Sequence, residues 1–136
     1  MSQLCIAAAQ VAPAYLDLDA SLAIAERWIT EAGRQGVRLL VFPEAWLPGY
    51  PFWLDVSPEM GLWDHAPTKA VFRRLFENSV EVPSPVTERL GRAARAASLN
   101  LVMGVNERDG GTLYNTILYF SESGELLGKH RKLIPT

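Results

Sequence analysis

Two short apolar runs, separated by a segment of helical period, constrain the fold of this chain more than any other feature. The runs cover residues 4–11 and 39–42, and uninterrupted apolar runs of this length are typical of strands that are buried on both faces. Between them, apolar residues recur at steps of three and four over residues 18–32, which predicts a helix that ends near Gly36. Because a helix is the usual connection between parallel strands, the sequence predicts a β-α-β unit.

The rest of the chain predicts further helices and strands around a long loop. Residues 45–68 contain four prolines and several aromatic side chains without a clear period, and a loop of this length in a compact domain usually has a function. Helices are expected over residues 69–78 and 84–97, and strands over residues 99–105, 112–120 and 126–133. This order of elements predicts an α/β or α+β layered domain.

The composition excludes several classes of protein. The chain has 136 residues, about the length of one domain, and 49% of them are hydrophobic, which excludes a disordered chain. Its net charge of −2 excludes a polybasic binder of nucleic acid or membrane surfaces. The single cysteine excludes an internal disulfide, and His65 and His130 lie too far apart for a zinc finger. We therefore expect neither a metal site of that kind nor a nucleic-acid partner.

The sequence also bears on the location of the protein. Its apolar runs fall short of the roughly 18 residues of a membrane-spanning helix. The run at residues 4–9 lacks the basic residues that precede the core of a signal peptide. We expect a soluble, cytoplasmic protein with no membrane partner.

Glu44 is the first candidate for chemistry because it directly follows an apolar strand. In open α/β sheets, ligands bind in the crevice beyond the carboxyl ends of the strands. A carboxylate in a partly apolar setting there has a raised pKa and can act as a general base. The alternative is an ordinary carboxylate at a strand end that faces water.

Lys132 is the second candidate. Alternation along a strand places Lys132 on the same face as His130, whereas Arg131 and Leu133 point the other way. A lysine on the covered face of a sheet needs a charged partner, and Glu44 can be that partner. We therefore expect Glu44 and Lys132 to project into one pocket. The alternative is a solvated basic strand.

Two other residues, Glu107 and Cys5, have side chains that could take part in chemistry. Glu107 also follows a strand end, so we give it a supporting role in the pocket, although the turn that follows favours a solvent-facing carboxylate. Cys5 lies in the first apolar run without a cationic neighbour, so we expect a buried, unreactive thiol.

Several short motifs follow one another along the chain. They are Phe42-Pro43-Glu44, Pro48-Gly49-Tyr50-Pro51, Gly104-Val105, Tyr114-Asn115-Thr116, Gly124 and residues 130–136. In this order, and over the whole chain, they resemble the nitrilase superfamily of carbon–nitrogen hydrolases. The Pro-Gly-Tyr loop resembles that of the nitrilase branch.

The resemblance implies an α/β fold, of which residues 1–136 form the N-terminal half of an αββα four-layer sandwich. It implies a Glu-Lys-Cys catalytic set without a cofactor or a metal. Glu44 is then the general base, Lys132 stabilises the tetrahedral intermediate, and Tyr50 lines the pocket. The implied reaction converts a small nitrile into a carboxylic acid and ammonia.

The aromatic side chains of the long loop suggest what the substrate is. Tyr50 and Trp53 favour an aromatic or arylaliphatic nitrile, and we expect both to contact it. The alternative is that these aromatic residues belong to the core or to a subunit contact.

The resemblance implies that part of the catalytic set lies outside this sequence. In the family, the nucleophilic cysteine lies beyond the lysine motif, and family members are about twice as long as this chain. One hypothesis is a hydrolase that is active only when a C-terminal half supplies the cysteine. The other is an inactive truncated chain or an assembly module of the same fold.

A half fold has a consequence for association. One face of the sheet then lacks its partner layer, and we expect apolar side chains such as Ile6, Ala8, Leu40, Phe42 and Val102 to lie on it. Large exposed apolar patches are rare on soluble monomers. We therefore expect a homo-oligomer, or a complex with a C-terminal half.

Overall fold

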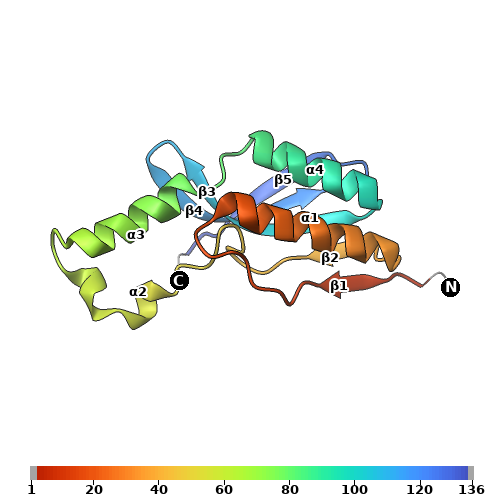
Figure 1. The fold of residues 1–136 in the computed structure, drawn as a ribbon. Helices are drawn as coiled ribbons and strands as arrows, with labels where there is room; N and C mark the ends of the chain where they lie inside the picture. The colour runs from red at the N-terminus through yellow and green to blue at the C-terminus, as the bar shows by residue number, and fades with distance from the viewer. Residues whose placement is uncertain (1–2, 135–136) are drawn as a thin grey trace.

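The computed structural model describes residues 3–134 as a mixed α/β fold. The strands are β1 (Ile6–Ala8), β2 (Leu39–Val41), β3 (Asn100–Asp109), β4 (Thr112–Phe120) and β5 (Leu126–Arg131), and the helices are α1 (Leu18–Arg34), α2 (Trp53–Val56), the short 3₁₀ helix η1 (Pro58–Gly61), α3 (Ala66–Glu77) and α4 (Pro85–Ala97). Figure 1 shows α1 and α4 lying along the sheet, while α2 and α3 extend to one side. The fold class expected from the sequence is confirmed.

The strands form one sheet in the order β1-β2-β3-β4-β5. The pairs β1–β2 and β2–β3 are parallel, and the pairs β3–β4 and β4–β5 are antiparallel. Helix α1 therefore connects two parallel neighbours, as the two apolar runs predicted. The sheet places β1 at one edge and β5, which precedes Lys132, at the other.

Local signals in the sequence set the helix ends. The Asp17 side chain caps α1 by accepting a hydrogen bond from the backbone N–H of Ala20 at 3.0 Å. Helix α4 begins at Pro85, whose missing N–H costs nothing in a first turn. The preceding Ser84 N–H donates to Thr87 Oγ1 at 2.9 Å. Both helices therefore begin where the sequence predicted.

The long loop is more ordered than the sequence indicated. The segment 45–68 contains α2 and η1, and α3 begins at Ala66 rather than at residue 69. Pro58 and Pro67 lie in the first turns of η1 and α3, where proline is tolerated. Single helical turns this short carry no hydrophobic period, so a pattern search misses them.

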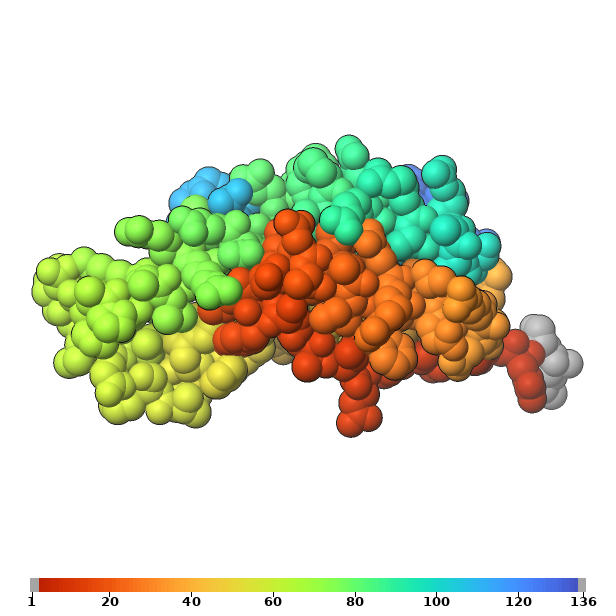
Figure 2. Space-filling view, viewed as in Figure 1, coloured from red at the N-terminus to blue at the C-terminus, as the bar shows by residue number. Residues whose placement is uncertain are grey.

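Helices α1 and α4 cover one face of the sheet and leave the other bare. Leu22 and Ile29 of α1 and Leu90 of α4 are fully buried against Leu101 and Met103 of β3. Figure 2 shows this covered side, on which α1 (red to orange) and α4 (green to cyan) form a continuous surface. We call the opposite side of the sheet the open face.

The open face differs in composition from the expected one. Strand register aligns Ile6 with Leu39 and Ala8 with Val41, so these residues share the open face. Leu40 and Phe42 are buried, contrary to expectation, because alternation along β2 turns Leu40 toward the helices.

Cys5 is also exposed rather than buried, and Ile6 is 64% exposed. The expectation of a first strand covered on both faces was wrong, because helices cover β1 on one face only.

The chain beyond β2 lies directly on β3 because Gly104 has no side chain. A Cβ atom at Gly104 would lie 2.0 Å from the carbonyl oxygen of Pro43, far inside van der Waals contact. The backbone of Leu47 then adds to β3, where its N–H donates to the Gly104 carbonyl oxygen at 3.1 Å. This close approach brings Glu44 over the open face.

A buried ionic cluster holds the end of β5 on the covered face. The Glu107 side chain is 1% exposed and accepts hydrogen bonds from Arg131 at 2.7 and 2.9 Å, from Thr116 at 2.8 Å and from Lys129. The alternative of a solvent-facing Glu107, which the following turn favoured, is therefore wrong. Arg131 also pairs with Asp109 at 2.7 Å. The cluster joins β3, β4 and β5.

Burial acts to raise the pKa of Glu107, but the hydrogen bonds from Arg131, Lys129 and Thr116 outweigh it and lower the pKa to about 2. Glu107 is therefore ionised throughout the neutral range.

Within residues 3–134, the helices are all too short or too polar to cross a membrane.

Replacing Gly104 by alanine tests the close approach. We expect Gly104→Ala to destabilise the fold by about 2–4 kcal/mol, because the new methyl group forces the 43–47 segment away from β3. The control is Gly128→Ala on β5, where no atom lies within 4 Å of the added Cβ. Urea unfolding of both variants measures the difference. Equal stability of the two would contradict the account.

Acid titration tests the Glu107 cluster. A lowered carboxyl pKa stabilises the folded state above the ordinary glutamate pKa, and this stabilisation is lost as the pH falls toward 2. We expect Glu107→Gln to be less stable than the parent by about 3 kcal/mol near neutral pH, with the gap narrowing between about pH 5 and pH 2.

The control for this titration is Glu81→Gln, which removes an ion pair between Glu81 and Arg108. The Glu81 side chain is 60% exposed. Exposed pairs contribute about 0–1 kcal/mol. Urea unfolding from pH 2 to pH 7 gives the comparison. A Glu107→Gln gap that does not change with pH would show that the charge is not the source of the stability.

Candidate active site

Glu44 and Lys132 meet at the open face from segments that are far apart in the sequence. The Lys132 Nζ atom lies 2.9 Å from Glu44 Oε1. Glu44 follows β2 after two residues, and Lys132 directly follows β5, whose residue 131 pairs with β4. The expected proximity of the two side chains is confirmed.

Asn115 of β4 completes this polar group. Its side-chain amide donates a hydrogen bond to the same Glu44 oxygen, and its backbone carbonyl accepts one from the Lys132 N–H at 2.8 Å. Asn115 therefore contacts both candidates, one through its side chain and the other through its backbone. The sequence contained the Tyr114-Asn115-Thr116 motif but gave Asn115 no role. Asn115 and Ile117 are two positions apart on β4 and so share a strand face. That spacing was the signal that could have placed Asn115 on the open face.

The hydrogen bond from Lys132 lowers the pKa of Glu44 below its ordinary value, and the hydrogen bond from Asn115 lowers it further. Partial burial acts in the opposite direction but is outweighed, so the carboxylate is ionised at neutral pH. The Glu44 side chain is 45% exposed and that of Lys132 is 37% exposed. Both are thus more solvated than the sequence argument assumed.

The pair lies at the wall of an apolar hollow of about 670 Å³. The hollow is lined by residues that follow or belong to four strands, and these are Val41, Phe42, Pro43, Glu44, Val102, Asn115, Ile117, His130, Lys132, Leu133 and Ile134. A volume of this size and a largely apolar wall with a few polar groups are typical of small-molecule sites. As expected from alternation, His130 lies on the same side as Lys132. Pro135 and Thr136, which end the sequence motif, lie outside the described residues.

Tyr50 lines a second, smaller hollow next to the first. It has a volume of about 220 Å³, and Asn115 belongs to the walls of both hollows. The Tyr50 carbonyl oxygen accepts a hydrogen bond from the Tyr15 hydroxyl at 2.7 Å, which anchors the loop at this point.

Trp53 lies elsewhere, in a small core cluster with Leu16 and Leu75, and is 8% exposed. Its ring makes edge contacts with Tyr15 and Phe72. Trp53 is absent from the walls of both hollows around Asn115, so the alternative of a core role suits this residue better than substrate contact.

Glu107 lies on the other side of the sheet from Glu44. Strand alternation turns Lys129 and Arg131 toward Glu107 and turns His130 and Lys132 toward the open face. Glu107 therefore contacts the two residues that flank His130, and not the pocket itself. A supporting role through β5 stays a prediction.

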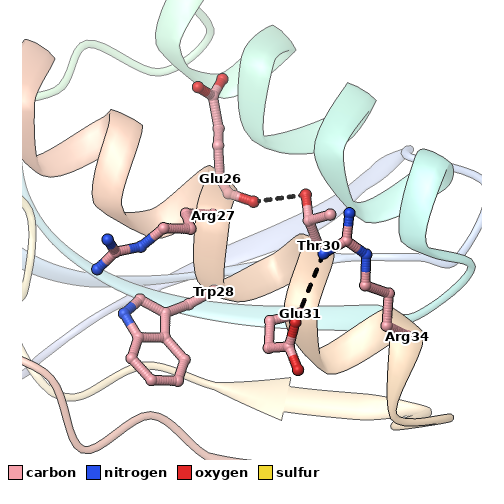
Figure 3. Close-up of a pocket in the computed structure, with 6 residues that line it drawn as sticks. All are labelled: Glu26, Arg27, Trp28, Thr30, Glu31 and Arg34. Atoms are coloured by element: carbon pink, nitrogen blue, oxygen red, sulfur yellow. Dashed lines mark hydrogen bonds and ion pairs between the residues drawn. The ribbon is translucent and has the colours of Figure 1, made fainter.

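Another hollow lies on the outer side of helix α1. It is lined by Glu26, Arg27, Trp28, Thr30, Glu31 and Arg34, and Figure 3 shows these side chains spreading from one helix. The Thr30 hydroxyl donates to the Glu26 carbonyl oxygen at 2.8 Å, and Arg34 pairs with Glu31 at 3.7 Å. These polar groups interact along the helix instead of converging on a shared point. We therefore place the candidate site at Glu44 and Lys132.

The part of the chain that the structure describes has no group of side chains suited to binding a metal ion. Among residues 3–134, His, Cys, Asp and Glu side chains form no group of three or more that could hold a metal ion.

Comparison with known proteins extends these observations. The model of the carbon-nitrogen hydrolase family matches residues 5–136. The chain is 42% identical over 127 residues to a bifunctional nitrilase/nitrile hydratase, NIT4A, from Nicotiana tabacum, covering 93% of this chain and 36% of that protein. It is 40% identical over 132 residues to a nitrilase from Bacillus sp. strain OxB-1, covering 96% of this chain and 37% of that one. The chain thus spans little more than a third of the length of these relatives.

Solved structures agree on the fold. An amidase of the nitrilase superfamily from Nesterenkonia superposes with a TM-score of 0.67 and 23% identity, over 99% of this chain and 45% of that one. Nit3 from Saccharomyces cerevisiae, a member of the same superfamily, superposes with a TM-score of 0.69 and 21% identity, over 96% of this chain and 44% of that one. With a family model that matches nearly every residue, this chain belongs to the carbon-nitrogen hydrolase family.

Proposed function

We propose that this chain contributes the general base and the lysine of a nitrilase-type enzyme that converts a small nitrile into a carboxylic acid and ammonia. The observation that carries the proposal is the Lys132–Glu44 contact of 2.9 Å at the wall of the apolar hollow. An ion pair with both side chains more than a third exposed contributes little to folding stability. A chemical use explains the arrangement better than a structural one. The named nitrilases among the relatives support the nitrile as substrate.

The proposed reaction begins with a cysteine thiolate supplied from outside these 136 residues. The thiolate attacks the nitrile carbon and forms a carbon–sulfur bond, while an electron pair moves to the nitrogen. Two water molecules are consumed in all, one to release ammonia and one to release the acid and regenerate the thiol. The carboxylate of Glu44 accepts protons from the thiol and from each water and returns them to the substrate nitrogen, which leaves as ammonia, and to the leaving thiolate. The ammonium of Lys132 offsets the negative charge that develops in each addition.

The electrostatics support this division of roles. Glu44 is ionised at neutral pH because Lys132 and Asn115 donate hydrogen bonds to it. A carboxylate with a lowered pKa is a weak base, and a second layer over the hollow would remove water from it. Burial of this kind raises a carboxyl pKa toward the working pH. We therefore propose that the base reaches full strength only when the hollow is covered.

The proposed partner is a C-terminal half, or further copies of the chain, seated on the open face. Exposed apolar side chains on that face include Ile6 at 64%, Tyr119 at 37% and Val41 at 36%. Burying about 800 Å² on each side, at roughly 25 cal/mol per Å², favours association before its entropic cost is counted.

We also propose that Tyr50 contacts the substrate, because its hollow shares Asn115 with that of Glu44. Trp53 supports that contact only indirectly, because its ring contacts Tyr15, whose hydroxyl donates to the Tyr50 carbonyl oxygen.

Catalytic substitutions test the proposed function. In a chimera, residues 5–136 replace the matched segment of the Bacillus nitrilase, which then supplies the remainder of the enzyme. We expect Glu44→Gln and Lys132→Met each to lower kcat at least about a hundredfold, because each removes a proton acceptor or the fixed cation. Ammonia release from an aromatic nitrile measures the rate. A glutamine variant with unchanged kcat would exclude Glu44 as the base.

Cys5→Ser is the matched control in the same chimera. Cys5 is exposed and precedes β1, away from the residues that line the hollow. We expect this variant to keep the parent rate, and the 136-residue chain alone to release no ammonia from nitriles or amides. Turnover by the chain alone that disappears in Cys5→Ser would overturn the proposal.

Two substitutions that introduce a lysine, one on each side of the sheet, test the proposed association. Tyr119 lies on the open face and is 37% exposed, and Trp28 lies on α1 and is 40% exposed. We expect the chain to sediment as an oligomer at micromolar concentration, Tyr119→Lys to shift it toward the monomer, and Trp28→Lys to leave it unchanged. A stable monomer in the parent chain would count against the open face as an interface.

A further inference from the structure

A single buried amide lies at the centre of the segment that joins Glu44 to Tyr50. Asn106 of β3 is 6% exposed. Its Nδ2 atom lies 3.0 Å from the carbonyl oxygen of Gly49, 3.3 Å from that of Leu47 and 3.4 Å from that of Ala45. An amide nitrogen carries two hydrogens, so it satisfies two of these acceptors at a time. Three alternate carbonyl groups therefore converge on one donor.

The backbone of Asn106 is held as firmly as its side chain. Its N–H donates to the Leu47 carbonyl oxygen at 2.7 Å, and its own carbonyl accepts a hydrogen bond from the Val80 N–H at 2.8 Å. Leu47 itself is fully buried. The amide thus projects from a fixed point on β3, which makes it a rigid support for the segment around it.

The segment needs such a support because its backbone is strained. Ala45 has a φ of 49°, in the left-handed region that is unfavourable for a residue with a side chain. Gly49 has a φ of 133°, which only glycine adopts readily. Strained backbone of this kind persists only when its surroundings determine it. The carbonyl groups of both residues are among those that the Asn106 amide contacts.

We propose that Asn106 is a positioning residue, whose amide holds the 45–49 segment on β3 and thereby fixes the Glu44 carboxylate at one end and Tyr50 at the other. For its catalytic meaning, this inference rests on the proposed function. The hydrogen bonds of the Asn106 side chain go to the backbone of the 45–49 segment and not to the Glu44 carboxylate. It acts through the backbone of Ala45, the residue that follows Glu44, and through that of Gly49, which precedes Tyr50.

The alternative is that Asn106 only stabilises the fold. A purely structural role lowers the melting temperature and leaves the folded molecules with a native Glu44. A positioning role changes Glu44 in molecules that remain folded, because the carboxylate moves away from Lys132 and Asn115. The two roles therefore differ in the Glu44 pKa and in kcat, and not in stability.

Titration of Glu44 in the 136-residue chain provides the first readout. The carboxyl carbon of Glu44 is followed by NMR and is assigned by its absence in Glu44→Gln. In Asn106→Leu, which keeps the branched shape and the number of heavy atoms but removes the donor, we expect the Glu44 pKa to rise toward the ordinary value of about 4.3. The matched control is Asn100→Leu, since Asn100 lies on the same strand and donates its amide to a carbonyl oxygen, that of Arg38, at 3.2 Å. We expect this control to leave the Glu44 pKa unchanged.

Kinetics in the Bacillus chimera provide the second readout. We expect Asn106→Leu to lower kcat about tenfold to a hundredfold, as a displacement of about 1 Å at a reacting group does, with the Asn100→Leu control at the parent rate. If the leucine variant does not fold, Asn106→Ala removes the donor with a smaller side chain and is measured in the same two ways. A native Glu44 pKa in the folded variant, or a native kcat, would overturn the inference.

The two readouts separate this inference from the proposed function. If the parent chimera hydrolyses no nitrile while the Glu44 pKa still rises in Asn106→Leu, the proposed function fails and the support of Glu44 by Asn106 stands. If the parent chimera is active and both readouts are unchanged in Asn106→Leu, the support fails and the proposed function stands.

Discussion

The contact between the Pro43 carbonyl and the bare backbone of Gly104 determines where the chemistry of this fold can lie. With no side chain at Gly104, the chain that leaves β2 crosses directly over β3. That crossing brings Glu44 within reach of Asn115 on β4 and of Lys132 after β5. A wider separation between the two backbones would leave the carboxylate short of both partners. The site therefore depends on backbone packing at least as much as on its own side chains.

Alternation along β5 divides the basic residues between two uses. Lys129 and Arg131 turn toward the covered face, where the buried Glu107 pairs with both. His130 and Lys132 turn to the open face and line the apolar hollow. Strand β5 thus anchors itself by charge on one side of the sheet, and Lys132, the residue that follows it, presents a cation on the other. A register error of one residue would exchange these uses, and the buried cluster is a strong safeguard against it.

Much of this arrangement could be predicted from the sequence. The apolar runs and the helical period between them gave the β-α-β unit and the fold class, because both patterns follow from burial. The Glu44–Lys132 contact was also within reach, since a strand end and an alternating strand define where each side chain points. Glu107 was harder, because a strand end looks alike whether its carboxylate meets water or two cations.

Other features depend on tertiary contacts, which a sequence pattern does not reveal. The exposure of Cys5 and Ile6 follows from which face the helices cover, and an apolar run has the same appearance in both cases. Asn106 was missed because its role lies in the carbonyl groups of a distant segment, and a single asparagine in a strand signals nothing by itself. The short helices α2 and η1 were not predicted because a single helical turn has no hydrophobic period.

The central claim is that Glu44 and Lys132 act as one unit on the reacting atoms. A double-mutant cycle in the Bacillus chimera tests it most directly, with kcat measured for Glu44→Gln, Lys132→Met and the double variant. Residues that act together are strongly non-additive. We expect the double variant to lose about as much activity as either single variant. Losses that multiply would show that the two residues act independently and would contradict the account.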